Sequence, residues 1–159
     1  MNQIVVRPAE PADDAAVTAV DALSTATLRE TYRPTKAALD NRARIAARLS
    51  RLVATCDGPI VGTVQWYVEN ESLRIVGLGV HPDFRRRGIA HQLLAHLAMI
   101  GRQQGATRLR LYTVQQTGNV DIFARLGFCV VAESEDRFSE SDRYPTLTAV
   151  EMQRSLDGS

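Results

Sequence analysis

The chain has 159 residues, which is enough for one domain with a hydrophobic core and too few for two domains of ordinary size. Hydrophobic residues make up 45% and charged residues 23%, as in globular proteins, and the net charge of +1 argues against a general nucleic-acid binder. No stretch approaches the roughly 20 apolar residues of a membrane span, and the apolar run Ile4 to Val6 is too short for a signal peptide, so we expect a cytoplasmic protein.

The first third of the chain predicts one strand and two helices. Ile4 to Arg7 is typical of a strand, and a turn rich in proline and aspartate leads into a helix from about Ala12. After a break over residues 30–34, Thr35 is placed to cap a second helix that extends to Ser50. The residues expected to face the core are Ala16, Val17, Val20, Leu23 and Leu28 in the first helix and Leu39, Ile45 and Leu49 in the second, whose exposed side would carry Arg42, Arg44, Arg48 and Arg51.

The middle of the chain predicts a hairpin, a central strand and a helix. Residues 52–56 and 60–68 flank an Asp-Gly-Pro turn, as strands of a hairpin do. Residues 73–80 form an apolar run that stops at His81-Pro82, and the glycines Gly77 and Gly79 within it mark a bulge or a close backbone approach. From Ile89 the pattern becomes helical, with Ile89, Leu93, Leu94, Leu97 and Ile100 on one face and Gly105 at the end.

The last third predicts a strand, a short helix and a closing pair of strands. Arg108 to Val114 alternates between polar and apolar residues, and Asn119 to Leu126 is helical up to Gly127. Residues 128–132 and 147–152 are strand-like, with a long polar loop over 133–145 between them. Strands and helices alternate before a hairpin-like end, so a mixed α/β sheet is expected.

Cysteine and histidine usage indicates neither a disulfide nor a metal site. Cys56 and Cys129 are far apart, and each lies in an apolar, strand-like run, so both are expected to be buried thiols. His81, His91 and His96 lack the ligand set and spacing of a zinc site.

The loop before the central helix has the features of an anion site. It reads Arg85-Arg-Arg-Gly-Ile-Ala90, with no Ser, Thr, Asp or Asn directly before the helix, so the first backbone N–H groups lack an obvious cap. Small residues let a ligand approach these donors at the positive end of the helix, where phosphate binds readily. Alternatives remain open at this point, because an arginine run is often only solvated surface and Asp83 could cap the turn.

The stretch from Val80 to Leu94 resembles the signature of the GCN5-related N-acetyltransferase (GNAT) family, with Arg85, Gly88 and Ala90 at the motif positions. Residues 122–128 are similar to the family's second signature. The resemblance implies a six- to seven-stranded, mostly antiparallel sheet, splayed at its central strands and carrying about four helices, in one domain over residues 1–159. It also implies acetyl-CoA as cosubstrate without a metal. The residues that would bind it are Leu78 and Val80 along the pantetheine arm, the loop residues Arg85, Arg86, Arg87, Gly88, Ile89, Ala90 and His91 at the pyrophosphate, and Asn119 and Phe123.

Two positions depart from the family pattern. The family commonly has a tyrosine that protonates the departing thiolate where this chain has Phe123, which has no proton to give. Some members place a glutamate near the position of Arg74, and an amine acceptor must lose a proton before it attacks. Candidates for acid or base are therefore Glu71, Tyr112 and Tyr144, with Glu69 and Tyr67 as further options.

The resemblance favours direct transfer of an acetyl group to a primary amine of a small molecule or peptide. The acceptor would approach between residues 24–36 and 133–146, where Tyr32, Arg33 and Tyr144 could contact it. Loss of the tyrosine and glutamate motivates an alternative, an acyl-CoA binding or sensing module with little catalysis. We expect neither nucleic acid nor membrane as a partner, and a homodimer is possible because members of the family often pair through their terminal strands.

Overall fold

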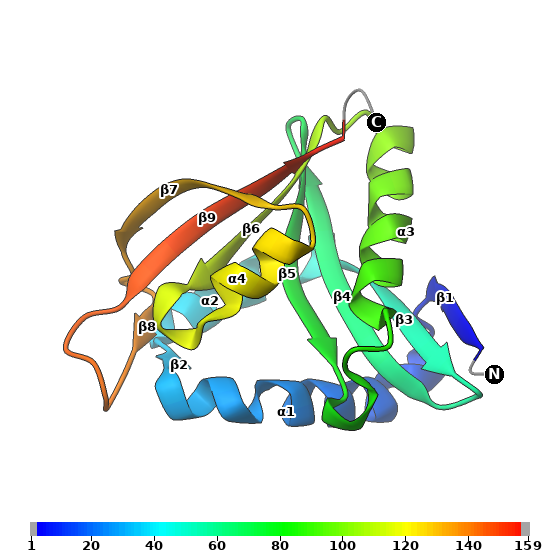
Figure 1. Ribbon diagram of the computed structural model, residues 1–159, viewed down its shortest axis with the longest axis horizontal. Coiled ribbons are helices and arrows are strands. Elements are labelled where there is room, and N and C mark those ends of the chain that lie inside the picture. Colours follow the sequence, from blue (N-terminus) through cyan, green and yellow to red (C-terminus); the bar gives the residue numbers. More distant parts are fainter. Residues whose placement is uncertain (1–2, 157–159) are drawn as a thin grey trace.

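The computed structural model describes residues 3–156, which form a seven-stranded sheet with helices on both faces (Figure 1). The strands lie in the order β1 (Ile4–Pro8), β3 (Ser50–Cys56), β4 (Ile60–Glu69), β5 (Ser72–Val80), β6 (Arg108–Val114), β9 (Thr148–Ser155) and β7 (Cys129–Glu135). Neighbouring strands are antiparallel except β5 and β6, which are parallel and joined through helix α3 (Ile89–Gln103). The mixed, mostly antiparallel sheet expected from the sequence is confirmed.

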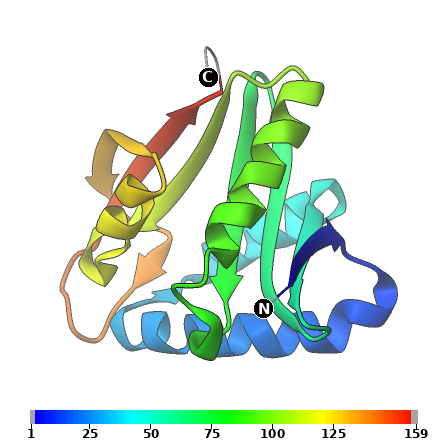
Figure 2. The same cartoon turned by 45° about the vertical axis from the view of Figure 1, so that its right-hand side comes forward.

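Three further helices cover the sheet. Helix α4 (Asn119–Arg125) lies on the same face as α3, and the two stand on either side of the point where β5 and β6 separate (Figures 1 and 2). Helix α1 (Asp14–Thr31) crosses β4 and β5 on the opposite face, and α2 (Lys36–Ile45) lies behind the sheet in Figure 1. The short strands β2 (Arg33–Pro34) and β8 (Ser139–Glu140) form a separate antiparallel pair.

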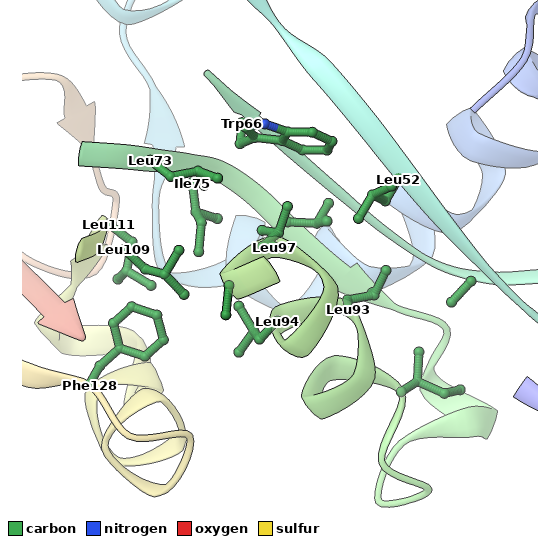
Figure 3. Packing of buried hydrophobic residues seen from close by; sticks show 14 of the residues in the cluster. Leu52, Trp66, Leu73, Ile75, Leu93, Leu94, Leu97, Leu109, Leu111 and Phe128 are labelled. Atoms are coloured by element: carbon green, nitrogen blue, oxygen red, sulfur yellow. The ribbon is translucent and has the colours of Figure 1, made fainter. Parts of the chain in front are cut away.

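The core lies between α3 and the sheet (Figure 3). The predicted apolar face of α3 is confirmed, because Ile89, Leu93, Leu94 and Leu97 are all almost completely buried. They belong to one core cluster with residues of the sheet and with Phe128 in the connection between α4 and β7: Leu52, Trp66, Leu73, Ile75, Leu109, Leu111 and Phe128. This packing fixes the start of α3 relative to the end of β5, and so positions the loop between them.

The second helix is shorter than predicted. It begins as expected, with the Thr35 hydroxyl accepting a hydrogen bond from the Ala38 amide at 3.2 Å, but it ends at Ile45 and gives way to a 3-10 turn over Ala46–Arg48. Ser50 and Arg51 belong to β3, where they pair with β4. Helix α2 buries no residue, and Leu39 is 52% exposed. Strand pairing therefore overrides the helical pattern here.

Other expectations were also wrong. Ala16 and Leu23, expected in the core, are exposed on α1, and the Cys129 thiol is exposed because β7 is the outermost strand and each of its residues faces solvent. Cys56 is buried as predicted. The segment 133–145 is not one long loop, since β7 continues to Glu135 and β8 forms within it.

An ion pair holds the start of α1 to β1 and makes stability depend on pH. The Asp13 carboxylate accepts hydrogen bonds from Arg7 at 2.8 and 3.1 Å and from the Glu10 amide at 2.8 Å. The hydrogen bonds from Arg7, and then that from Glu10, lower the pKa of Asp13 from its ordinary 3.8 to about 2. A carboxyl group whose pKa is lowered by folding stabilises the fold above its ordinary pKa, and this contribution disappears as the pH falls from 3.8 through 2.

We therefore expect Asp13→Asn to lower the free energy of unfolding at pH 6 and to lose this difference from the native chain near pH 2. Urea titrations of both chains across that range measure it. Asp14→Asn is the control, because it removes the neighbouring exposed carboxylate, whereas the hydrogen bonds from Arg7 go to Asp13. If the difference in free energy of unfolding between Asp13→Asn and the native chain stayed constant from pH 6 to pH 2, Asp13 would not be the source of the pH dependence.

Candidate active site

The loop between β5 and α3 leaves the start of the helix open. Gly88 precedes α3 with φ +81°, and no side chain caps the helix there. The Asp83 side chain does not cap this end, because no side chain accepts a capping hydrogen bond at the start of α3. In the preceding 3-10 turn, His81 Nδ1 accepts from the backbone amide of Asp83. A Cβ atom added to Gly88 would meet nothing within 4 Å. The first N–H groups of α3 therefore point to open space at the positive end of the helix dipole.

Three exposed arginines surround this helix start. Arg86 adopts a left-handed conformation with φ +64°, and the Arg87 guanidinium lies 4.9 Å from the centre of the Phe84 ring. Arg85 completes the positive charge at the same turn. Backbone donors, the helix dipole and three arginine residues thus occur together at one turn, a combination that suits a pyrophosphate group.

Strands β5 and β6 separate soon after they begin. They pair only at Ser72–Arg108, Leu73–Leu109 and Arg74–Arg110, and beyond this point no residue of β5 is paired with β6 (Figure 1). The edge of β5 that carries Leu78 and Val80 is therefore not joined to a neighbouring strand on that side. An extended arm with amide groups can supply the missing hydrogen-bond partners, as an added strand would.

The predicted irregularity of β5 is present at its glycines. The register between β4 and β5 shifts so that Gln65 pairs with Gly77 and Trp66 with Ile75, which leaves Val76 as the extra residue of a bulge. The bulge lies two residues after Arg74, the last residue of β5 that pairs with β6. The predicted close approach is at Gly79, against which α1 packs Ser24.

A half-buried carboxylate of α1, Asp21, lies beside this contact. Its carboxylate is 3.6 Å from Arg51, and Arg51 also donates to the Thr63 hydroxyl at 2.6 Å. Burial raises the pKa of Asp21, and the positive charges of Arg51 and Arg42 only partly oppose that effect. The sequence pattern does not indicate the pairing of Asp21 with Arg51, because that pattern predicts Arg51 on an exposed helix face.

A cluster of tyrosine and arginine side chains occupies the point where the strands part, on the face opposite α3. The Arg74 guanidinium lies 4.6 Å from the centre of the Tyr112 ring and donates to the Tyr67 hydroxyl at 3.2 Å. The Tyr112 hydroxyl donates to Glu151 at 2.7 Å and accepts from Arg110 at 2.9 Å. Four strands contribute these groups, so no local pattern in the sequence indicates that they meet.

The three sequence candidates for acid or base do not form one constellation. Tyr112 belongs to the cluster just described, whereas Glu71 lies exposed in the turn between β4 and β5, with its carbonyl bound by the Thr107 amide at 2.7 Å. Tyr144 is exposed in the loop before β9, where its amide donates to Ser141. Among residues 3–156, these three side chains share no hydrogen bond.

The two segments proposed to receive the acceptor lie side by side. β2 pairs with β8, the Thr35 amide donates to the Phe138 carbonyl at 3.0 Å, and the Ser141 hydroxyl donates to the Thr31 carbonyl. Arg33 forms ion pairs with Glu140 and Asp142, both at 3.1 Å, so its charge is largely committed within the protein. Tyr32 lies under the Arg29 guanidinium at 5.3 Å.

Asn119 and Phe123 lie on α4, across the separated strands from α3. Phe123 is partly buried and packs edge-to-face on Phe128, with 5.9 Å between ring centres. The backbone amide of Asn119 donates a hydrogen bond to the Thr117 hydroxyl at 3.2 Å.

Other site types find no support in the part of the chain that the structure describes. Residues 3–156 contain no group of three or more His, Cys, Asp or Glu side chains placed to hold a metal ion. Within the same residues, no helix is both long and apolar enough to cross a membrane.

Comparison with known proteins gives one family. The model of the Acetyltransferase (GNAT) family matches residues 18–128. An acetyltransferase of Photorhabdus laumondii is 36% identical over 90 residues, which cover 57% of this chain and 59% of that protein. The chain thus matches less than two thirds of the length of this relative.

Solved structures agree on the fold. The ribosomal-protein-S18-alanine N-acetyltransferase of Escherichia coli superposes with a TM-score of 0.75 at 17% identity, covering 99% of this chain and 96% of that one. The structure of yncA from Salmonella typhimurium, which contains its cofactor acetyl-CoA, has a TM-score of 0.73 at 23% identity with the same coverage. At these identities the likeness concerns the fold alone.

Proposed function

Because the chain belongs to the GNAT family of acetyltransferases, we propose that it transfers an acetyl group from acetyl-CoA to a primary amine. The observation that carries the proposal is the open start of α3 beside an unpaired edge of β5. In this assignment, the amides of Arg86 to His91 bind the pyrophosphate, and the backbone of Leu78 and Val80 bonds the pantetheine arm. The acetyl-CoA in the structure of yncA supports the choice of cosubstrate.

The proposed reaction is a direct transfer. The acceptor nitrogen bonds to the acetyl carbonyl carbon, the carbon–sulfur bond breaks, the nitrogen loses a proton and the sulfur gains one. The residues of this chain contribute mainly by holding the two reactants in line, which can by itself account for large rate increases. In this proposal, the backbone amide of Val80, on the edge of β5 that is not paired with β6, binds the carbonyl oxygen as it gains negative charge.

A screen for release of free thiol tests this function. Purified protein with acetyl-CoA should release thiol with at least one member of a panel of small amines, amino acids, aminoglycosides and peptides. Calorimetry with coenzyme A distinguishes an acetyltransferase from the second candidate function, an acyl-CoA binding module. Tight binding without thiol release from any acceptor would favour that module, which Phe123 and Arg74 already suggest because neither can act as the family's usual acid or base.

Phe123→Tyr tests whether the reaction lacks a proton donor. If no group of the chain protonates the departing thiolate, a hydroxyl at this position should raise kcat several-fold without changing coenzyme A affinity. Steady-state kinetics and calorimetry measure the two quantities. An unchanged kcat would indicate that another donor already serves the thiolate. Phe128→Tyr, on the partner ring in the core, is the control for adding a hydroxyl.

A further inference from the structure

The Arg74 guanidinium lies where β5 and β6 begin to separate, and no carboxylate among residues 3–156 forms an ion pair with it. Arg74 is the last residue of β5 that pairs with β6, so its side chain lies where the gap between them begins. Its one hydrogen bond goes to an uncharged phenol, Tyr67, and it forms no ion pair with any residue between 3 and 156. A guanidinium has five N–H donors, so most of those of Arg74 remain for another partner.

The neighbouring arginine shows the contrast. Arg110 pairs with Arg74 across the two strands, but its guanidinium lies 3.4 Å from the Glu151 carboxylate and donates to the Tyr112 hydroxyl. Both guanidinium groups contact the Tyr112 ring, but only that of Arg110 has a carboxylate partner among residues 3–156. A planar guanidinium supported by an aromatic ring suits a carboxylate, which it can bind with two parallel hydrogen bonds.

The surrounding charge also favours an anion. Three guanidinium groups, those of Arg48, Arg74 and Arg110, contact the rings of Tyr67 and Tyr112. Only two carboxylates, Glu69 and Glu151, hydrogen bond to the hydroxyls of the same tyrosines. The cluster is therefore net positive, which attracts an anionic acceptor and repels a polycationic one.

We propose that Arg74 binds the carboxylate of an amino acid-sized acceptor, a small molecule that carries both a primary amine and a carboxylate. This inference rests on the proposed acetyl transfer. Binding the carboxylate at the end of the gap places the adjacent amine beside the reacting thioester.

Matched pairs of ligands test the inference. Each pair consists of an amino acid and its carboxamide, which keeps the amine and side chain but lacks the negative charge. With the native protein, we expect kcat/KM to be at least about tenfold higher for the best acid than for its amide. Arg74→Gln should remove that preference by lowering kcat/KM for the acid about 10- to 100-fold, with little effect on the amide. Arg74→Lys, which keeps the charge but not the fork, should be intermediate.

A second readout separates this inference from the proposed function. Calorimetry measures binding of the N-acetyl amino acid and its amide to the protein saturated with coenzyme A, whether or not transfer occurs. If no amine is acetylated but the N-acetyl acid binds more tightly than its amide in an Arg74-dependent way, acetyl transfer fails and the carboxylate site stands. Arg44→Gln is the control, because this substitution removes one positive charge, as Arg74→Gln does, but at an exposed position on α2. Equal affinity for acid and amide, or an equal loss in Arg44→Gln, would overturn the proposal.

Discussion

Gly88→Val should weaken coenzyme A binding by at least about 100-fold while leaving the protein folded. Gly88 has φ +81°, and a β-branched residue in this region carries about 1–3 kcal/mol of backbone strain. If the loop relaxes to relieve that strain, the first amides of α3 no longer converge. If it does not relax, the new side chain occupies the open space through which pyrophosphate approaches. Calorimetric titration with coenzyme A measures the loss.

Gly105 supplies a matched control at the other end of the same helix. It has φ +80°, and a Cβ atom there also meets nothing within 4 Å, so Gly105→Val introduces comparable strain away from the loop. Both variants should lower the melting temperature to a similar degree, but only Gly88→Val should lose coenzyme A affinity. If Gly88→Val and Gly105→Val bound coenzyme A with similar affinity, pyrophosphate would not bind at the start of α3, and the assignment of the site would fail.

Gly79→Val should destabilise the fold by about 1–3 kcal/mol, the usual cost of inserting side-chain atoms into a packed contact. A Cβ atom at Gly79 would overlap the Ser24 hydroxyl and lie 3.1 Å from Ser24 Cβ, so α1 would have to move away from β5. This movement would also disturb Asp21 and Arg51, which lie at the same contact. Unfolding in urea, followed by circular dichroism, measures the change.

Gly77 is the natural comparison, because it lies two residues earlier on β5 and a Cβ atom there meets nothing within 4 Å. Gly77→Val should cost clearly less stability than Gly79→Val. Combining Gly79→Ala with Ser24→Gly should recover much of the loss caused by Gly79→Ala alone, since the colliding atoms are absent. Equal costs at the two glycines, or no recovery in the double variant, would mean that packing of α1 does not explain the glycine at position 79.

Patterns within short segments predicted most of the sheet and the open helix start for which we propose phosphate binding. The strand over 73–80, the glycine-entered helix and its buried face were recognised because each depends on neighbouring residues: apolar periodicity, an absent cap and a change from period two to helical period. Segments whose structure depends on distant partners were assigned wrongly. Ser50 and Arg51 continue a helical pattern but pair with β4, and β8 forms within a polar loop because β2 lies beside it.

The site divides in the same way. The proposed anion-binding end can be predicted from the sequence, because the uncapped amides and the arginines before Gly88 are consecutive in the chain and need only a helix to come together. The other end depends on tertiary structure, since Tyr67, Arg74 and Tyr112 meet there from three strands. Their contact depends on strand register and on β5 leaving β6 after Arg74, and both are set by pairing between residues far apart in sequence.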